Sequence, residues 1–120
     1  MTVLIVESST DLGSVWLRHL QRAGMTAILV TDAESAMSLL QSEPIHVIIL
    51  DLVLDQGNAL TVADFASFRQ PDCRVIFVTN TTFFSDGSIF QLCANACAFV
   101  PSATRPDDLT AIVQHHAPRA

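Results

Sequence analysis

The segment His46-Val47-Ile48-Ile49-Leu50-Asp51 decides the fold of this chain. A continuous run of Val, Ile and Leu is typical of a strand that is buried on both faces of a sheet. The run ends at Asp51, and open α/β sheets hold their ligands outside the carboxyl ends of their strands. We therefore expect Asp51 to lie in a functional site.

The composition predicts one globular domain over residues 1–120, without a separate output domain. Half of the 120 residues are apolar, 15% are charged, and the formal net charge is −6. The acidic balance argues against nucleic acid and anionic membranes as partners. No apolar run reaches the roughly 18 residues of a membrane span, and no basic leader opens the chain. Three cysteines without framework spacing favour a reducing cytoplasm.

Strand-like and helix-like segments alternate five times along the chain. The apolar, β-branched runs are residues 3–6, 27–30, 46–50, 74–78 and 98–100. Apolar residues with helical spacing form four stripes, which begin at Leu12, Ala33, Ile89 and Leu109. The stripe that begins at Ile89 ends at Ala96. The segment from Asn58 to Phe68 is less periodic but has the length of a helix. Expected helix boundaries are Thr10 or Asp11 and Gly24 for the first helix, Asp32 and Pro44 for the second, and Pro106 for the last. This alternation predicts a doubly wound α/β fold: a five-stranded parallel sheet of order 2-1-3-4-5, flanked by five helices and flavodoxin-like.

Polar side chains end three of the predicted strands. The first strand runs into Glu7 and Ser8, the third ends at Asp51, and the fourth ends at Thr79. Because strands one and three are neighbours at the switch point of such a sheet, Glu7 and Asp51 should converge. Two carboxylates and a hydroxyl suit a hard divalent cation and a phosphoryl group, and a carboxylate can form an aspartyl phosphate.

Four segments, in order, resemble those of a response-regulator receiver domain. Val-Leu-Ile-Val-Glu7 resembles the first strand with its acidic end, and Val-Ile-Ile-Leu-Asp51-Leu-Val-Leu resembles the phosphoacceptor strand. Val-Ile-Phe-Val-Thr79 resembles the strand with the switch hydroxyl, and Asn-Ala-Cys-Ala-Phe99-Val the strand with the switch aromatic. The resemblance covers the whole chain.

This resemblance implies a non-enzymatic module of two-component or phosphorelay signalling. Asp51 would accept phosphate from a histidine kinase or phosphotransferase, and a downstream protein would read the change. Mg²⁺ would be held by Glu7, Asp51 and the backbone carbonyl of Val53. Thr79 would hydrogen-bond the phosphoryl group, and Phe99 would change rotamer with it.

The sequence departs from the family pattern in the residues that support the aspartate. Ser8 stands in place of the usual second acid, and Ser102 in place of the usual lysine. Asp55 or Asp11 could supply a carboxylate, and Arg105 is the nearest cation in sequence to the lost lysine. Because Mg²⁺ relies on carboxylate charge, we expect its binding to be weak or absent.

Two other functions remain open at this stage. One is a phosphorylation-independent pseudo-receiver that acts as a scaffold. The other is a small flavin or nucleotide carrier that binds phosphate at residues 8–14.

Phe90, with Phe83 and Phe84, predicts a partner surface or homodimer on the face of helix four, strand five and helix five. Cysteines 93 and 97 are expected to be apolar core or helix-face residues.

Overall fold

In the computed structural model, which describes residues 1–79 and 95–116, the chain forms one parallel sheet. The order is β2-β1-β3-β4-β5, as the sequence predicts. The strands are β1 (Thr2–Val6), β2 (Thr26–Val30), β3 (Val47–Asp51), β4 (Arg74–Thr79) and β5 (Ala96–Pro101). The central strands β1 and β3 are almost wholly buried, because apolar runs without alternation fit a sheet that is covered on both faces.

Four helices are present among the described residues. They are α1 (Thr10–Arg22), α2 (Ala33–Ser42), α3 (Ala59–Arg69) and α5 (Pro106–His116). Most of the expected stripe from Ile89 to Ala96 lies outside the described residues. Its last member, Ala96, is the first residue of β5, so its assignment to a helix was wrong.

Side-chain caps begin three of these helices. Asp32 caps α2 and Asn58 caps α3, each accepting a hydrogen bond from a backbone N–H of the first turn. The expectation for α1 was wrong by one residue: Ser9 is the cap, and Thr10 and Asp11 already lie inside the helix. Ser9 is favoured because its Oγ accepts from the N–H of Leu12 while its backbone remains extended.

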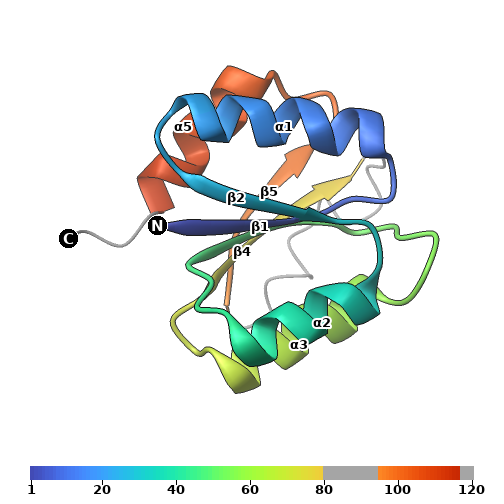
Figure 1. Cartoon of the computed structure of the whole chain (residues 1–120). Helices are drawn as coiled ribbons and strands as arrows, with labels where there is room; N and C mark the ends of the chain where they lie inside the picture. Colours follow the sequence, from blue (N-terminus) through green and yellow to red (C-terminus); the bar gives the residue numbers. More distant parts are fainter. Residues whose placement is uncertain (80–94, 117–120) are drawn as a thin grey trace.

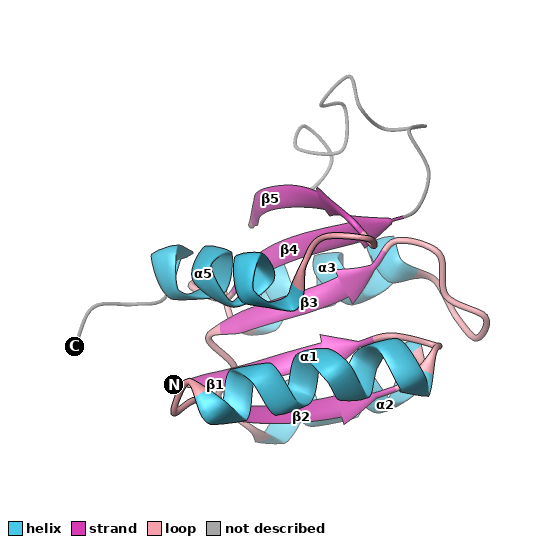
Figure 2. Cartoon of the chain, turned by 90° about the horizontal axis from the view of Figure 1, so that it is seen from above, coloured by secondary structure: helices cyan, strands magenta, loops and turns pink. Residues whose placement is uncertain are grey.

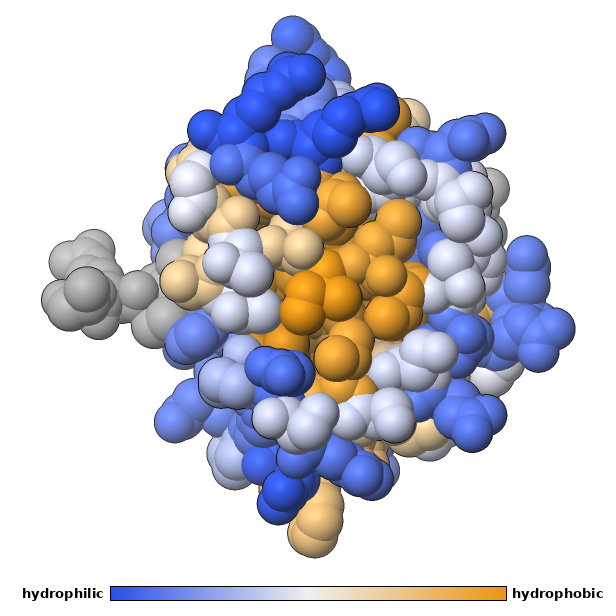
Figure 3. Space-filling model, viewed as in Figure 1, coloured by the Kyte–Doolittle hydropathy of each residue, from blue (hydrophilic) through white to orange (hydrophobic). Residues whose placement is uncertain are grey.

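The helices form two layers (Figures 1 and 2): α1 and α5 cover one face of the sheet, and α2 and α3 cover the other. One hydrophobic core fills each interface. Trp16 and Leu20 of α1 pack in the first, and Ala36 and Leu40 of α2 in the second. The outer strand β2 is only half-buried, and apolar side chains gather over it between α1 and α2 (Figure 3). No helix within residues 1–79 and 95–116 is long and apolar enough to cross a membrane.

The register of the strands brings the polar residues at their carboxyl ends to the same level of the sheet. Leu50 of β3 pairs with Val6 of β1, so the next residue of each strand, Asp51 and Glu7, stands at the same level. Asp51 in turn pairs with Val78, one residue before Thr79. The carboxyl ends of β1, β3 and β4 therefore present their polar residues at one edge of the sheet.

Candidate functional site

The two predicted carboxyl groups meet at this edge. The charge of Asp51 acts directly on Glu7, and a side-chain hydrogen bond joins the two groups. Asp51 is half-buried at the end of β3, and its Oδ1 accepts a hydrogen bond from the N–H of Val53 at 3.0 Å. The convergence expected from the sheet topology is thus present.

Glu7 is an unusual carboxylic acid because only 4% of its surface is exposed. Its Oε1 accepts a hydrogen bond from the N–H of Ser9 at 3.3 Å, but no described N–H or O–H group reaches its Oε2. Burial raises the pKa of Glu7 to about 8, helped by the hydrogen bond with Asp51 and by the charges of Asp51 and Asp55. Since two carboxyl groups share a hydrogen bond only when one is protonated, the pair requires a proton or a cation.

Ser8, at the position of the usual second acid, contacts the loop that follows Asp51. Its Oγ accepts a hydrogen bond from the backbone N–H of Asp55 at 2.9 Å. This contact ties the segment after β1 to the segment after β3. It also keeps Asp55 close enough for its charge to raise the pKa of Glu7. Asp55 is thus an exposed neighbouring charge that acts on Glu7, while Asp11 is not among the charges that act on Glu7.

The loop from residue 52 to residue 58 is also held on its other side, by the start of α2. The N–H of Ala33 donates to the carbonyl of Gln56 at 3.2 Å. Gly57 follows with φ +93°, and a Cβ on it would lie 2.4 Å from the Cβ of Ala33. Glycine is required here for both reasons. The loop that leaves Asp51 is thus clamped between Ser8 and α2.

The predicted switch residues lie on the two strands next to Asp51. Thr79 is buried at the end of β4, and its carbonyl accepts a hydrogen bond from the N–H of Ser102 at 2.8 Å. Phe99 pairs with Phe77 across β4 and β5 and is half-buried against the core under α2 and α3. Ser102 therefore stands beside the site, as expected for the position of the usual lysine. The chain contains no lysine at all, so no lysine at another position can replace the usual one.

Several sequence predictions concern other parts of the chain. Phe83, Phe84, Phe90 and Cys93 lie outside the described residues, as does the part of the proposed homodimer face that precedes β5, whereas β5 and α5 are described. Cys97 is half-buried in β5, a strand rather than a helix face, and it is a free thiol. Arg105 is exposed in the turn before α5.

No group of three His, Cys, Asp or Glu side chains converges as a metal site within the described part of the chain. Glu7 and Asp51 form a two-carboxylate site instead. Mg²⁺ is compatible with such a site because it keeps several water ligands and commonly uses only one or two carboxylates. The orphaned Oε2 of Glu7 is the position at which a cation would replace the proton.

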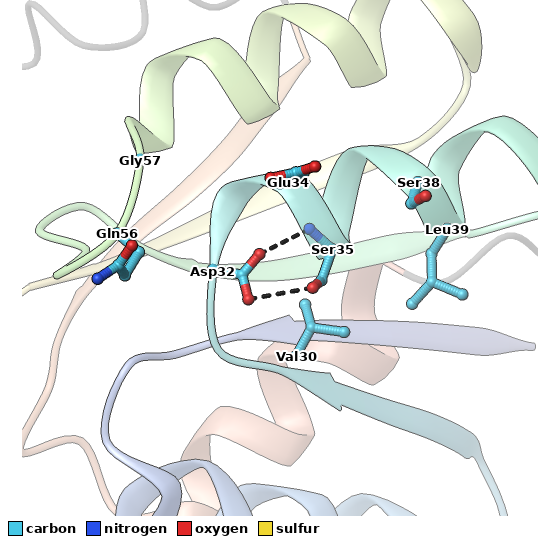
Figure 4. Close-up of a pocket in the computed structure, with 8 residues that line it drawn as sticks. All are labelled: Val30, Asp32, Glu34, Ser35, Ser38, Leu39, Gln56 and Gly57. Carbon is cyan, nitrogen blue, oxygen red and sulfur yellow. Dashed lines mark hydrogen bonds between the residues drawn. The ribbon is translucent and has the colours of Figure 1, made fainter.

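A groove that no sequence pattern predicts lies next to this site (Figure 4). It has a volume of about 680 Å³ and lies between the end of β2, the first turns of α2 and the loop after β3. Val30 and Leu39 supply apolar lining, and Gln56 and Gly57 of the clamped loop line it as well. Asp32 contributes a carboxylate that already accepts hydrogen bonds from the N–H and Oγ of Ser35. The groove depends on contacts between distant segments, which local sequence patterns do not encode.

The fold and the acidic edge define a class: a doubly wound α/β domain with an aspartate and a buried acid at the switch point. The sequence profile of the response regulator receiver domain matches residues 3–114. The chain belongs to this family, the receiver domains of two-component response regulators, whose signalling is based on phosphorylation.

Individual receiver proteins and solved structures are also similar to this chain. The response regulator receiver protein CpdR of Brucella abortus (strain 2308) is 26% identical over 77 residues, which are 64% of this chain and 64% of that protein. A CheY-like receiver domain protein of Methanospirillum hungatei JF-1 has the same fold, with a TM-score of 0.86 and 21% identity over 95% of this chain and 90% of that chain. A response regulator of Burkholderia pseudomallei, solved with a phosphorylated aspartic acid, calcium ion and citrate, has a TM-score of 0.81 and 17% identity over 95% of this chain and 71% of that one.

Proposed function

We propose that this chain is a phosphoacceptor receiver in which Asp51 takes up a phosphoryl group, with a weakly bound Mg²⁺ beside it. The observation that carries the proposal is the buried Glu7 next to Asp51, with an Oε2 that no described donor satisfies. Two adjacent carboxyl groups, one of them buried, need a proton or a cation between them, and a divalent cation shared by Glu7 and Asp51 would supply that positive charge.

Glu7, Asp51 and the backbone carbonyl of Val53 would hold the ion, and Asp55 would act through water. When bound, Mg²⁺ supplies charge that balances the carboxylates and the oxygens of the incoming phosphoryl group. The phosphorylated aspartic acid and the calcium ion of the Burkholderia pseudomallei regulator support this use of the same fold.

Asp51 and Thr79 would carry out the phosphoryl transfer itself. Asp51 attacks the phosphorus atom of a phosphohistidine or small phosphodonor: an Oδ–P bond forms, and the bond to the leaving group breaks. The hydroxyl of Thr79 donates to a phosphoryl oxygen. Because no lysine completes the site, the aspartyl phosphate lacks a charge-assisted contact of about 1.5–3 kcal/mol. We therefore expect slow phosphorylation and low occupancy.

A histidine kinase or phosphotransferase would supply the phosphoryl group, and a downstream protein would bind the phosphorylated form. We propose a signalling module rather than an enzyme, because the described part of the site offers Asp51 as a single phosphoryl acceptor and the chain belongs to the receiver family. Family membership and the free thiols of Cys73 and Cys97 support a cytoplasmic location.

The test is phosphorylation of the purified chain by acetyl phosphate or phosphoramidate with and without Mg²⁺, followed by intact-mass spectrometry. We expect one added phosphoryl group, dependent on Mg²⁺ and lost in Asp51→Asn. Asp55→Asn is the matched control: it removes a neighbouring acid of the same loop and should slow the reaction without abolishing it. Labelling that persists in Asp51→Asn would contradict the assignment.

One observation favours a second function, that of a phosphorylation-independent pseudo-receiver. Ser8 is engaged in fixing the loop through the N–H of Asp55, so the clamp exists without phosphate. In that case Asp51→Asn would leave binding to the downstream partner unchanged. A loss of partner affinity in Asp51→Asn, or a gain after phosphorylation, would exclude this alternative.

A further inference from the structure

The outer edge of β2 is open. The N–H of Thr26 donates to Met1 and the carbonyl of Val30 accepts from Glu7, so both of these residues direct their peptide groups toward β1. Peptide groups alternate in direction along a strand, and therefore Ala27 and Leu29 direct theirs outward. Since β2 is the last strand of the sheet on this side, the outward groups have no strand to pair with among the described residues.

This edge lacks the features that usually prevent strands of two molecules from pairing. The sequence of β2 is Thr-Ala-Ile-Leu-Val, without charge, proline or glycine. The opposite edge strand, β5, ends in Pro101 and has a register shift against β4 between Val75 and Ile76. Proline and irregular register both hinder edge pairing. The two edges of the sheet therefore differ, and only β2 is suited to pairing.

Apolar side chains flank the open edge. Residues Ala27 to Val30 are each half-buried, and they gather in the middle of the face that shows β2 between α1 and α2 (Figure 3). Val30, at the end of β2, also lines the groove beside α2, together with Leu39 of that helix (Figure 4). Half-buried apolar side chains beside an open strand edge favour a protein partner.

The charges around β2 are arranged with opposite signs at its two ends. Arg22, in the last turn of α1, precedes the strand, and Asp32 and Glu34, at the start of α2, follow it. When two copies of β2 run antiparallel, the basic end of each lies beside the acidic end of the other. The strand itself carries no charge that would repel its copy.

We infer that a second copy of this chain pairs with β2 antiparallel, about a two-fold axis near Ile28. Ala27 of one copy then stands opposite Leu29 of the other, and their outward N–H and carbonyl groups form the ladder. The two sheets become one continuous sheet, and the interface is the same surface on both copies. β2 lies at the opposite edge of the sheet from β5, which belongs to the face that the sequence predicts for a homodimer.

Sedimentation velocity of the full chain, over a range of concentrations, tests the inference with two matched variants. Ala27→Pro removes an outward N–H while leaving the ladder to β1 intact, so it should give a folded monomer. Ala27→Val keeps that N–H and should dimerise as the parent does. Circular dichroism checks that both variants fold.

A charge exchange tests the orientation and remains informative even where Ala27→Pro fails to fold. Arg22→Glu places like charges beside Glu34 of the second copy and should weaken dimerisation about tenfold, which is a modest electrostatic change. Combining it with Glu34→Arg should restore dimerisation. A parent chain that stays monomeric at every concentration would overturn the inference. So would a dimer that persists in folded Ala27→Pro or dissociates only in Phe90→Ser.

Discussion

The Oγ of Ser8 accepts a hydrogen bond from the backbone N–H of Asp55 at 2.9 Å, across 47 residues of sequence. A serine at the position of an expected metal-binding acid thus has a structural role: it fixes the loop that follows Asp51. The loop remains in place, but the charge that an acid would bring to a cation is missing.

Rebuilding that charge should activate the site. Ser8→Asp adds a carboxylate for Mg²⁺, and Ser102→Lys adds an ammonium group beside Thr79 for the phosphoryl oxygens. We expect the double variant to bind Mg²⁺ about tenfold more tightly, since ~1.4 kcal/mol of added attraction is modest for a partly buried charge. Phosphorylation of Asp51 by acetyl phosphate should also be faster. Trp16 fluorescence or amide chemical shifts would follow Mg²⁺, and intact mass would follow phosphorylation.

Ser9→Asp is the control for this experiment. It adds the same charge one residue away and keeps a good cap for α1. It should change Mg²⁺ affinity much less than Ser8→Asp does. Equal effects of the two acids would show that general charge, not the position of Ser8, limits binding.

Glu7 should make stability fall as pH rises. Burial raises the pKa of Glu7 in the folded chain to about 8, from the 4.5 of an ordinary glutamate. Between these values the folded state binds more protons than the unfolded state, so the free energy of unfolding decreases with pH. This contribution is complete below the lower value and is lost as pH rises through the higher one.

Glu7→Gln cannot ionise and should abolish this slope, which is at most about 1.4 kcal/mol per pH unit. Urea unfolding monitored by the single, buried Trp16, from about pH 6 to about pH 9, measures it. Glu34→Gln, an exposed acid of α2, should keep the parent's slope. Mg²⁺ should stabilise the parent most at high pH, and an effect independent of pH would contradict competition between the cation and this proton.

Gln70 should be a major stabilising residue away from the site. Its Nε2 donates to the carbonyls of Leu40 and Glu43 at 2.9 and 2.7 Å, and its Oε1 accepts from the N–H of Ile45 at 2.8 Å. Gln70→Ala removes all three bonds to the α2–β3 connection, two of which, those to Ile45 and Leu40, are partly buried. We expect a loss of about 2–3 kcal/mol in the free energy of unfolding.

Arg69→Ala is the comparison, because Arg69 makes one exposed hydrogen bond, to the carbonyl of Gln41. Its cost should be below about 1 kcal/mol. Urea unfolding of both variants gives the two numbers. Similar values would mean that solvent replaces the contacts of Gln70 without penalty.

Gly57→Ala should loosen the loop after β3. Its added Cβ would overlap Ala33, in addition to the strain of a positive φ. Gly24→Ala has the same kind of φ, +87°, but nothing within 4 Å of the added Cβ. We expect about 1 kcal/mol for Gly24→Ala, with a larger loss for Gly57→Ala. Thermal and urea unfolding compare the two, and equal losses would show that the loop moves away from α2 freely.

The sequence alone determined the layer structure and the pairing of the two acids. Apolar runs without alternation specify strands that are buried on both faces, and a parallel sheet must bring the ends of neighbouring strands to one edge. Glu7 and Asp51 could therefore be placed together from their positions in the runs. The cap at Asp32 and the start of α5 at Pro106 were also local signals, which depend on a few consecutive residues.

Only the tertiary structure decided how the site is supported. Helical spacing suggested a helix at Ala96, but pairing with Val75 of β4 makes it a strand residue. The bond from Asp55 to Ser8, the contact of Gly57 with Ala33 and the burial of Glu7 all join segments that are distant in sequence. Local periodicity reports which face of an element is apolar, but not which loop will lie against it. The depth at which Glu7 is buried, and with it the pKa of that acid, is therefore set by packing between elements.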